Sequence, residues 1–513
     1  MRTENSIKNI SIGIFSQIVI VLLGFLSRKV FIDSLGTEYL GINGFLTNVL
    51  SLLSLVEGGI GTSIVYNIYK PLAENNIEKV TALVQLYKKM YSIIAVIVFL
   101  LSLGLYPFLN IFIKGDSSIS YITIVYFIFV FRNMISYLNA HKWSLINADQ
   151  KGYILARVNL IFNIITTVSK ICILILTQNY IVYLIIDILI YIIQNIYNGQ
   201  VVERRYPYIK TKKKYKVENE IKSNVVTNVK ALFLHNIGGY CVYGTDNILI
   251  SALVNINTVG LYSNYTLVSG QLGNLINPII NSIGDSIGNL IATEDNEKMY
   301  KIFKVTYLIN FWVYSVSTIF LLCLLEPFIS WAFGNGLLLD KLSFIFILIN
   351  FYINGMRGSI ANFKNKGGIF AQDKYVPLIE SLINLGASII LAKYFGLAGI
   401  FMGTTISNAA IPLWNKPRLV YKYIFNKSVK EYMKTYMLYI FYTLIAGTIT
   451  LSICSLVIIK NQFISLIIKG VICVIVPNVM YIVLLRKTYE FNYIVQIIKN
   501  NSISKKIKLK FVR

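Results

Sequence analysis

Apolar runs of 18 or more residues recur along the whole chain and alternate with short polar clusters. As a helix, such a run spans the roughly 30 Å of hydrocarbon in a bilayer and satisfies its own backbone hydrogen bonds where no water is present. The pattern predicts an all-α fold, a polytopic transmembrane bundle of about fourteen helices. The expected spans are residues 10–34, 40–69, 90–112, 119–140, 157–178, 180–197, 225–252, 259–290, 303–325, 341–361, 376–395, 397–414, 435–457 and 462–485.

Basic residues gather in every second connection between these runs. With the N-terminus placed in the cytoplasm, 37 of the 48 Lys and Arg residues fall in the tails and inner connections, and six fall in outer ones. Cytoplasmic connections carry such an excess. The sequence therefore predicts a multi-pass membrane protein with both termini in the cytoplasm. The net charge of +25 reflects this topology, and no nucleic-acid partner is expected.

The two halves of the chain align when the sequence is shifted by 219 residues. The ungapped register pairs Gly41 with Gly260, Thr47 with Thr266, and Glu78-Lys79 with Glu297-Lys298. Six spans per half is an even number, so the halves share one orientation, as in parallel-repeat transporters. The predicted segments are six-helix lobes at 1–200 and 225–425, a basic cytoplasmic linker at 201–224, two additional helices at 426–490 and a basic cytoplasmic tail at 491–513.

The connections leave little room for catalysis. The outer connections are short, and the longest inner one is only a linker, so the sequence predicts a protein that is not an enzyme. The five cysteines lie in apolar segments and lack the spacing of a metal or disulfide motif. No cofactor and no metal are expected.

The second span of each half contains residues that interrupt a helix. Gly58, Gly59 and Gly61 do so in the first half, and Pro278 and Gly284 stand at the equivalent place in the second. Glycine loosens a helix, and proline removes a backbone hydrogen bond. Paired interruptions predict hinges beside the substrate path of a transporter. The alternative is close helix packing by small residues.

Ionisable residues within spans are costly and usually face a cavity or a partner. Arg28 and Lys29 lie about two turns before the outer end of the first span, and Asp246 with Asn247 occupies the matching place in the seventh. These residues predict a polar central cavity in which Arg28, Lys29 and Asn247 bind substrate. The alternative for Arg28 and Lys29 is that they snorkel to the outer headgroups.

Two further arginines lie on equivalent spans, Arg132 on the fourth and Arg357 on the tenth. A guanidinium makes bidentate contacts with phosphate oxygens, so both are candidates for diphosphate binding. The alternative for Arg357 is a side chain that reaches the inner membrane interface. Lys170 and Asp187 fall at similar depths on adjacent spans, which predicts a structural ion pair.

Three acidic residues are candidate sites for a coupling ion, either a proton or sodium: Glu57, Asp246 and Asp285. Glu57 lies at mid-span beside the glycines, and its alternative is a neutral carboxyl hydrogen-bonded to the neighbouring helix. His235 is a further titrating candidate, although a single histidine usually makes a polar contact only.

Several stretches carry a family likeness by their order and spacing. They are Leu26-Ser27-Arg28 through Glu38-Tyr39-Leu40-Gly41 to Asn43-Gly44, Tyr69-Lys70-Pro71-Leu72, Gly244-Thr245-Asp246-Asn247, Val259-Gly260-Leu261-Tyr262-Ser263 and Gly403-Thr404-Thr405-Ile406-Ser407. Together they resemble the capsule and O-antigen (Wzx-type) polysaccharide flippases. These belong to the multidrug, oligosaccharidyl-lipid and polysaccharide exporter (MOP) superfamily. The resemblance covers most of residues 1–425.

The resemblance implies two lobes around a central cavity and alternating access. The cargo it implies is an undecaprenyl-diphosphate-linked oligosaccharide, with Arg28 and Arg132 as diphosphate ligands and membrane lipids and a polysaccharide polymerase as partners. Two other members of the superfamily are alternatives. A peptidoglycan lipid-precursor flippase also carries two extra C-terminal helices, and a multidrug or cation antiporter is expected to have an acidic cavity.

Overall fold

The computed structural model describes residues 2–57, 60–113, 121–149, 151–217, 240, 244–369 and 371–500, and this part of the chain is almost entirely helical. Ten helical segments in it are long and apolar enough to cross a membrane. The bent pair α6 (Ile122–Leu138) and α7 (Ala140–Ala148), with 44° between its helices, gives up to eleven. The chain is therefore a multi-pass membrane protein, and the all-α class predicted from sequence is confirmed.

The chain divides into two compact units, Met1–Ser263 and Asn264–Arg513. The division falls inside α12 (Ile256–Thr293), just after α11 (Asp246–Leu253). Helix α11 packs on α2 (Thr37–Leu53) and α5 (Leu109–Phe112), so it belongs with the first unit. The lobes at 1–200 and 225–425 stay a prediction.

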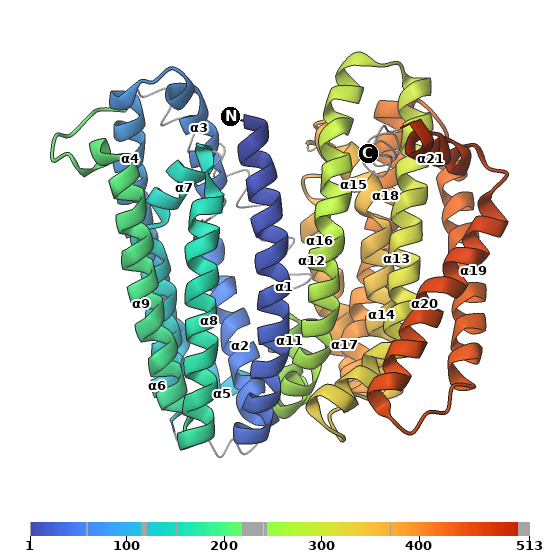
Figure 1. Cartoon of the computed structure of the whole chain (residues 1–513), viewed down its shortest axis with the longest axis horizontal. Helices are drawn as coiled ribbons and strands as arrows, with labels where there is room; N and C mark the ends of the chain where they lie inside the picture. The colour runs from blue at the N-terminus through green and yellow to red at the C-terminus, as the bar shows by residue number, and fades with distance from the viewer. Residues whose placement is uncertain are drawn as a thin grey trace, which may run out of the picture. The chain divides into compact units, whose positions relative to one another are not determined.

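The first unit consists of long helices packed side by side (Figure 1). Helix α1 (Arg2–Leu35) runs along α8 (Gly152–Thr177), and α8 packs on α9 (Tyr180–Arg205). Helix α4 (Ile77–Leu105) contacts α3 (Ile60–Ala73), α6 and α7. Buried side chains such as Tyr87, Tyr91 and Ile146 form the core between these helices.

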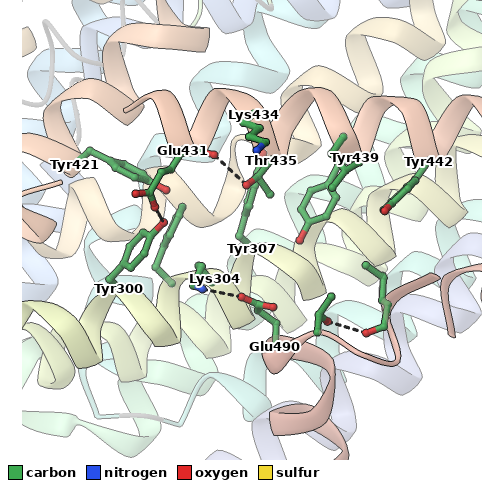
Figure 2. A pocket seen from close by; sticks show the side chains of 14 residues that line it. Tyr300, Lys304, Tyr307, Tyr421, Glu431, Lys434, Thr435, Tyr439, Tyr442 and Glu490 are labelled. Carbon is green, nitrogen blue, oxygen red and sulfur yellow. Dashed lines mark hydrogen bonds and ion pairs between the residues drawn. The ribbon is translucent and has the colours of Figure 1, made fainter. Parts of the chain in front are cut away.

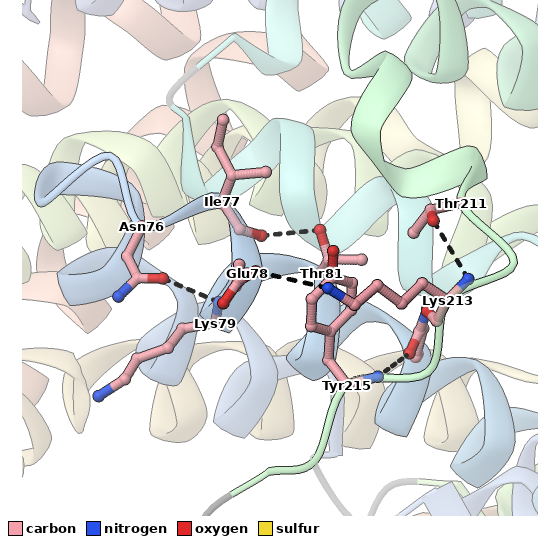
Figure 3. Close-up of polar contacts among 9 residues, drawn as sticks. Asn76, Ile77, Glu78, Lys79, Thr81, Thr211, Lys213 and Tyr215 are labelled. Atoms are coloured by element: carbon pink, nitrogen blue, oxygen red, sulfur yellow. Dashed lines mark hydrogen bonds and ion pairs between the residues drawn. The ribbon is translucent and has the colours of Figure 1, made fainter.

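The basic linker that follows α9 docks on α4 (Figure 3). The amide of Gln85 donates to the carbonyl of Lys213 at 2.7 Å and accepts from the backbone N–H of Tyr215 at 3.2 Å. The Lys213 ammonium lies 3.9 Å from the Glu78 carboxylate. Just after α9, burial and a hydrogen bond to Asp149 raise the pKa of Tyr206 above its usual range. These contacts fix the path of the linker along the first unit.

In the second unit, α13 (Asn296–Phe333) contacts α14 (Lys341–Met356) and α15 (Gly358–Lys366). Helices α16 (Val376–Phe395) and α17 (Leu397–Ala410) form a close pair, and α18 (Pro412–Val420) follows them. The pair is joined by Gly396, whose φ of 55° is accessible to glycine. A Cβ on Gly403 would lie 2.5 Å from the backbone nitrogen of Ser388, so glycine is also needed for this packing distance.

The C-terminal helices α19 (Lys430–Ser455), α20 (Gln462–Leu485) and α21 (Tyr489–Asn500) pack on α13 through aromatic side chains. Phe311 of α13 stacks on Tyr439 of α19 with 4.0 Å between ring centroids, and it also meets Tyr481 of α20. All three side chains are buried. The two additional helices predicted from the sequence are therefore integral to the core of the second unit.

Large apolar side chains cover the outer faces of many helices. Leu176 is 81% exposed and Leu382 is 70% exposed, for example. A soluble monomer rarely exposes extended apolar surface, whereas a lipid-facing helix requires it. An apolar hollow of about 540 Å³ opens on such a surface beside Phe99 and Phe131. Lipid contact is the physical reason why hydropathy located these spans.

The predicted spans agree with the helices in most places, and three differences are informative. The interruption in the second span exists, because α2 gives way to the 3-10 turn Ser54–Glu57 and α3 begins at Ile60. Its expected counterpart is absent, since α12 is helical from Ile256 to Thr293. The seventh span lies largely outside the described residues, with α11 at its end. The total of fourteen therefore stays a prediction.

Candidate functional site

Arg28 lies on α1, two turns before the helix ends at Leu35. Its Nη1 donates to the hydroxyl of Ser263 on α12 at 2.8 Å, and Ser263 donates to the carbonyl of Gly260 at 2.7 Å. Within the described residues no carboxylate forms an ion pair with Arg28. Lys29 differs, since its ammonium pairs with Asp33 at 2.9 Å and is 41% exposed. Arg28 is therefore a half-buried cation that retains hydrogen-bonding capacity.

The neighbouring residue of α12 connects this arginine to the predicted acidic residue. The hydroxyl of Tyr262 lies 3.5 Å from Oδ2 of Asp246 on α11. The Oδ1 atoms of both Asp246 and Asn247 are buried and have no hydrogen-bond partner among the described residues. Consecutive residues of α12 thus contact Arg28 and Asp246, which the sequence places more than 200 positions apart. Arg28 and Asp246 therefore contact adjacent residues of α12.

The backbones of α2 and α12 meet at two glycines. A Cβ on Gly41 would overlap the carbonyl oxygen of Ile256, and a Cβ on Gly260 would overlap that of Thr37. The side chain of Thr37 also donates to Asn257. The 219-residue shift that relates Gly41 to Gly260 also relates Thr37 to Ile256, so each glycine faces the equivalent carbonyl. The repeat found in the sequence therefore forms a pseudo-twofold contact.

The Gly41→Ala substitution is expected to lower the free energy of unfolding by about 1–3 kcal/mol, because an added methyl at this approach forces the backbones apart. Chemical denaturation of the detergent-solubilised protein measures the change. Gly24→Ala on α1 is the matched control, since a Cβ there has no atom within 4 Å. Equal stabilities for the two variants would contradict the close approach of α2 and α12.

A second set of charges in the first unit is centred on Asp187 of α9. Its two oxygens accept from Lys170 at 2.9 Å and from Arg132 at 2.8 Å. The same cations lie over tyrosine rings, Lys170 above Tyr183 at 4.2 Å and Arg132 above Tyr191 at 4.7 Å. The predicted pair of Lys170 with Asp187 is confirmed. Arg132 joins it, and a carboxylate therefore already occupies part of its guanidinium.

A third set is buried in the second unit around Arg357. Its guanidinium lies 3.6 Å from Glu380 of α16 and also donates to Asn408 of α17. On the following helix, Lys364 pairs with Asp373 at 2.7 Å. All four charged side chains are less than 10% exposed. Arg357 therefore does not reach the membrane interface as one reading of the sequence expected, because Glu380 and Asn408 hold it inside the unit.

The structure describes the remaining candidate residues to different extents. Glu57 accepts a hydrogen bond from the hydroxyl of Tyr91 on α4 at 3.1 Å. This contact agrees with the alternative given for Glu57, a carboxyl hydrogen-bonded to the neighbouring helix. Gly58, Gly59 and His235 lie outside the described residues. Gly61 belongs to α3, and Pro278, Gly284 and Asp285 belong to α12. The surroundings of these four residues lie outside the described part of the structure. Their proposed roles stay predictions.

A cavity of about 320 Å³ lies between α13, α19 and the segment leading to α21 (Figure 2). Tyr300 donates to Glu431 at 2.5 Å near one end, and Lys304 pairs with Glu490 at 3.0 Å. Sequence reasoning missed this cavity because its lining comes from segments that share no motif. The polar pairs in it fasten the C-terminal helices to α13.

Known membrane transporters share this fold. A structure of the lipid II flippase MurJ, in an inward closed conformation, matches with a TM-score of 0.68 over 93% of this chain and 99% of that one, at 15% identity. An inward-facing multidrug resistance MATE family transporter of the MOP superfamily gives a TM-score of 0.55 over 77% of this chain and 94% of its own, at 13% identity. A mutant of the Vibrio cholerae MATE transporter VcmN gives 0.55 over 83% of this chain and 99% of its own, at 13% identity.

No protein-family model and no curated protein sequence matches the chain. The similarity to solved structures therefore concerns the fold alone. The Wzx-type assignment stays a prediction.

Proposed function

We propose that the chain is a flippase that moves an undecaprenyl-diphosphate-linked oligosaccharide, the repeat unit of a capsule or O-antigen polysaccharide, across the bacterial plasma membrane. The observation that carries this proposal is the state of Arg28. Its guanidinium lies within a predicted span, contacts the neutral Ser263 and forms no ion pair with a carboxylate of the described residues. Such a group is available to two oxygens of a diphosphate.

The physical need for this cation comes from the cargo. Transferring an ionised group into hydrocarbon without a partner costs many kcal/mol, and a diphosphate carries more than one charge. A guanidinium inside the span lowers this cost, while the lipid tail stays in the bilayer. Arg132 and Arg357 serve this purpose less well, because Asp187 and Glu380 already bind them. Lys29, which pairs with Asp33, and Asn247 complete the proposed polar surface as secondary contacts.

Alternating access needs a contact that forms in one state and opens in another. The pseudo-symmetric approach of α2 and α12 at Gly41 and Gly260 has the form of such a contact, since two equivalent backbones meet without side chains between them. We assign it as the gate that closes one end of the path. The break after α2, with Gly58, Gly59 and Gly61, would serve as the hinge of this gate, and Pro278 and Gly284 would let α12 bend.

Among the coupling candidates, Asp246 has the geometry of an ion site. Among the described residues, one of its carboxylate oxygens is buried without a hydrogen-bond partner. A proton or a sodium ion would satisfy this oxygen. Glu57 is a weaker candidate because Tyr91 already donates to it. Asp285 stays a candidate by sequence position alone.

The second candidate function is the transport of a peptidoglycan lipid precursor. The favouring observation is the extent of the match to the lipid II flippase, which covers 93% of this chain, against 77% and 83% for the two MATE transporters. A multidrug or cation antiporter fits less well, since Arg28, the cavity candidate that has no acidic partner among the described residues, is a cation. Both cargo lipids carry a diphosphate, so Arg28 would have one role in either case.

The test is transport by the full chain reconstituted in vesicles. Fluorescent polyprenyl-diphosphate oligosaccharide, lipid II and an organic cation are supplied in parallel, and a membrane-impermeant quencher reports the leaflet of each. Faster translocation of the oligosaccharide lipid is expected. Preference for lipid II would favour the second candidate, and movement of the organic cation alone would overturn both flippase readings. Co-purification with a polysaccharide polymerase would be a separate indication of the pathway.

A further inference from the structure

Three cysteines that are far apart in the sequence meet inside the second unit. Cys323 is on α13, Cys454 on α19 and Cys473 on α20, and their Sγ atoms all lie within 4.8 Å of one another. The Sγ atoms of Cys454 and Cys473 are 3.9 Å apart. Each side chain is at most 6% exposed. The spacing along the chain, 131 and 19 residues, resembles no metal motif, so only the fold reveals the cluster.

Two of the three cysteines lie well inside their helices, whereas Cys454 is next to the last residue of α19. Cys473 is eleven residues into α20, which is about 16 Å from its first residue at 1.5 Å per residue. Cys323 is ten residues before the end of α13, or about 15 Å. Trp331 and Phe463 are in ring contact at 5.3 Å, so both distances are measured from the same end. The thiols of Cys323 and Cys473 therefore lie about 15 Å from this end of their helices, and all three thiols are enclosed by the second unit.

Three sulfur atoms at this separation fit a single three-coordinate centre. With bonds of about 2.3 Å, three sulfurs around one centre form a triangle with edges of about 4.0 Å if the centre is planar and about 3.5 Å if it is pyramidal. The observed separation of 3.9 Å lies between these values, and the limit of 4.8 Å for the other pairs requires only a small inward movement of the thiols. No His, Asp or Glu of the described residues joins the group. Thiolate ligands select soft, thiophilic centres.

The burial of the cluster decides the charge of that centre. A charged complex in a buried site is costly, and three thiolates carry three negative charges. A monovalent ion would leave two of these charges and a divalent ion one, whereas a trivalent centre leaves none. The side chain of Lys469, one turn before Cys473 on α20, is the nearby cation that a divalent ion would need.

We propose that Cys323, Cys454 and Cys473 form a binding site for a trivalent thiophilic metalloid, of the arsenite or antimonite class. The uncharged trihydroxide enters the apolar site, and three bonds from the metalloid to oxygen are replaced by three bonds to sulfur. Each thiol proton leaves with one hydroxide as water, so three waters are released. The oxidation states and the total charge do not change. The product ties α19 and α20 to α13.

The test uses the full chain in detergent, kept reduced by a phosphine because a dithiol would compete. After incubation with sodium arsenite and desalting, one arsenic per chain is expected, with three of the five cysteines no longer free. X-ray absorption at the arsenic edge should show three sulfur neighbours. The arsenic count and the X-ray absorption measurement use the wild-type chain, so they test the site even if a cysteine substitution prevents folding. Two sulfur neighbours, or no retained arsenic, would overturn the site.

Substitutions distinguish this site from binding at another cysteine and from a site for a divalent ion. Cys323→Ser, Cys454→Ser and Cys473→Ser should each weaken arsenite binding by roughly 100-fold, as expected when one arm of a multivalent contact is lost. Cys172→Ser is the matched control because Cys172 is exposed on α8, and its affinity should equal that of the wild type. Lys469→Met should also leave arsenite binding unchanged. Loss of binding in Lys469→Met, or selective retention of cadmium over arsenite by the wild type, would overturn the trivalent assignment.

Discussion

The Arg28→Ala substitution is expected to slow translocation of a diphosphate-linked lipid by about 100-fold or more. Two charge-assisted hydrogen bonds to phosphate oxygens are worth about 3 kcal/mol together at the lower end of their range, and 1.4 kcal/mol corresponds to tenfold. Arg28→Lys keeps the charge but loses the bidentate geometry, so an intermediate rate is expected. The initial rate in reconstituted vesicles measures both changes.

The control for this experiment is Lys393→Ala, which removes one exposed cation from the last turn of α16. Its rate should stay within about twofold of the wild type, because exposed charges contribute little. Arg28 has Ser263 as its partner and no carboxylate among the described residues, so Arg28→Ala should remain folded. A folded Arg28→Ala protein that transports at the wild-type rate would show that the diphosphate role is wrong.

The sequence located the helices because their boundaries depend on local physics. A run of apolar residues becomes a span wherever it meets lipid, and α16 and α20 begin and end where the hydropathy pattern placed them. Depth along a span is also local information. Lys170 and Asp187 were paired correctly for this reason, since they lie at similar depths on helices joined by a short turn. The repeat register succeeded in the same way at Gly41 and Gly260.

The partners of the intramembrane arginines depend on contacts between distant segments, and here sequence reasoning was insufficient. Arg28, Arg132 and Arg357 were all candidates for substrate binding because each is a cation within a predicted span. The fold gives Arg132 a carboxylate from α9 and Arg357 a carboxylate from α16, whereas it gives Arg28 a hydroxyl. A spacing rule could not have found these partners. The same limit hid the three cysteines of α13, α19 and α20.

The helix interruptions show a further difference between local and tertiary effects. The second span leaves α-helical geometry at the 3-10 turn Ser54–Glu57, just before Gly58 and Gly59, which lie outside the described residues. Pro278 at the equivalent place does not end α12, whose helix continues to Thr293. Prolines are tolerated in membrane helices because neighbouring groups satisfy the freed carbonyl. The sequence therefore predicts where a helix can bend, and packing decides whether it does.

The Arg357→Met substitution is expected to lower the free energy of unfolding by about 3–5 kcal/mol, because it leaves the Glu380 carboxylate buried without its cation. Glu380→Gln should destabilise for the converse reason. The double variant should be much closer to the wild type than the sum of the single changes, since it leaves no uncompensated charge in this pair. Denaturant titrations of the four proteins in detergent give the interaction energy.

The comparison of Arg357 with Arg28 separates structural from transport roles of arginines in one membrane protein. Arg357→Met should change stability, and the double variant with Glu380→Gln should recover transport together with stability, because neither residue is needed to bind the diphosphate. Arg28→Ala should do the opposite, with transport lost and stability largely kept. If the stable double variant still failed to transport, Arg357 would have to act on the cargo as well. Its burial, at 8% exposure, and its contacts with Glu380 and Asn408 argue for the structural role.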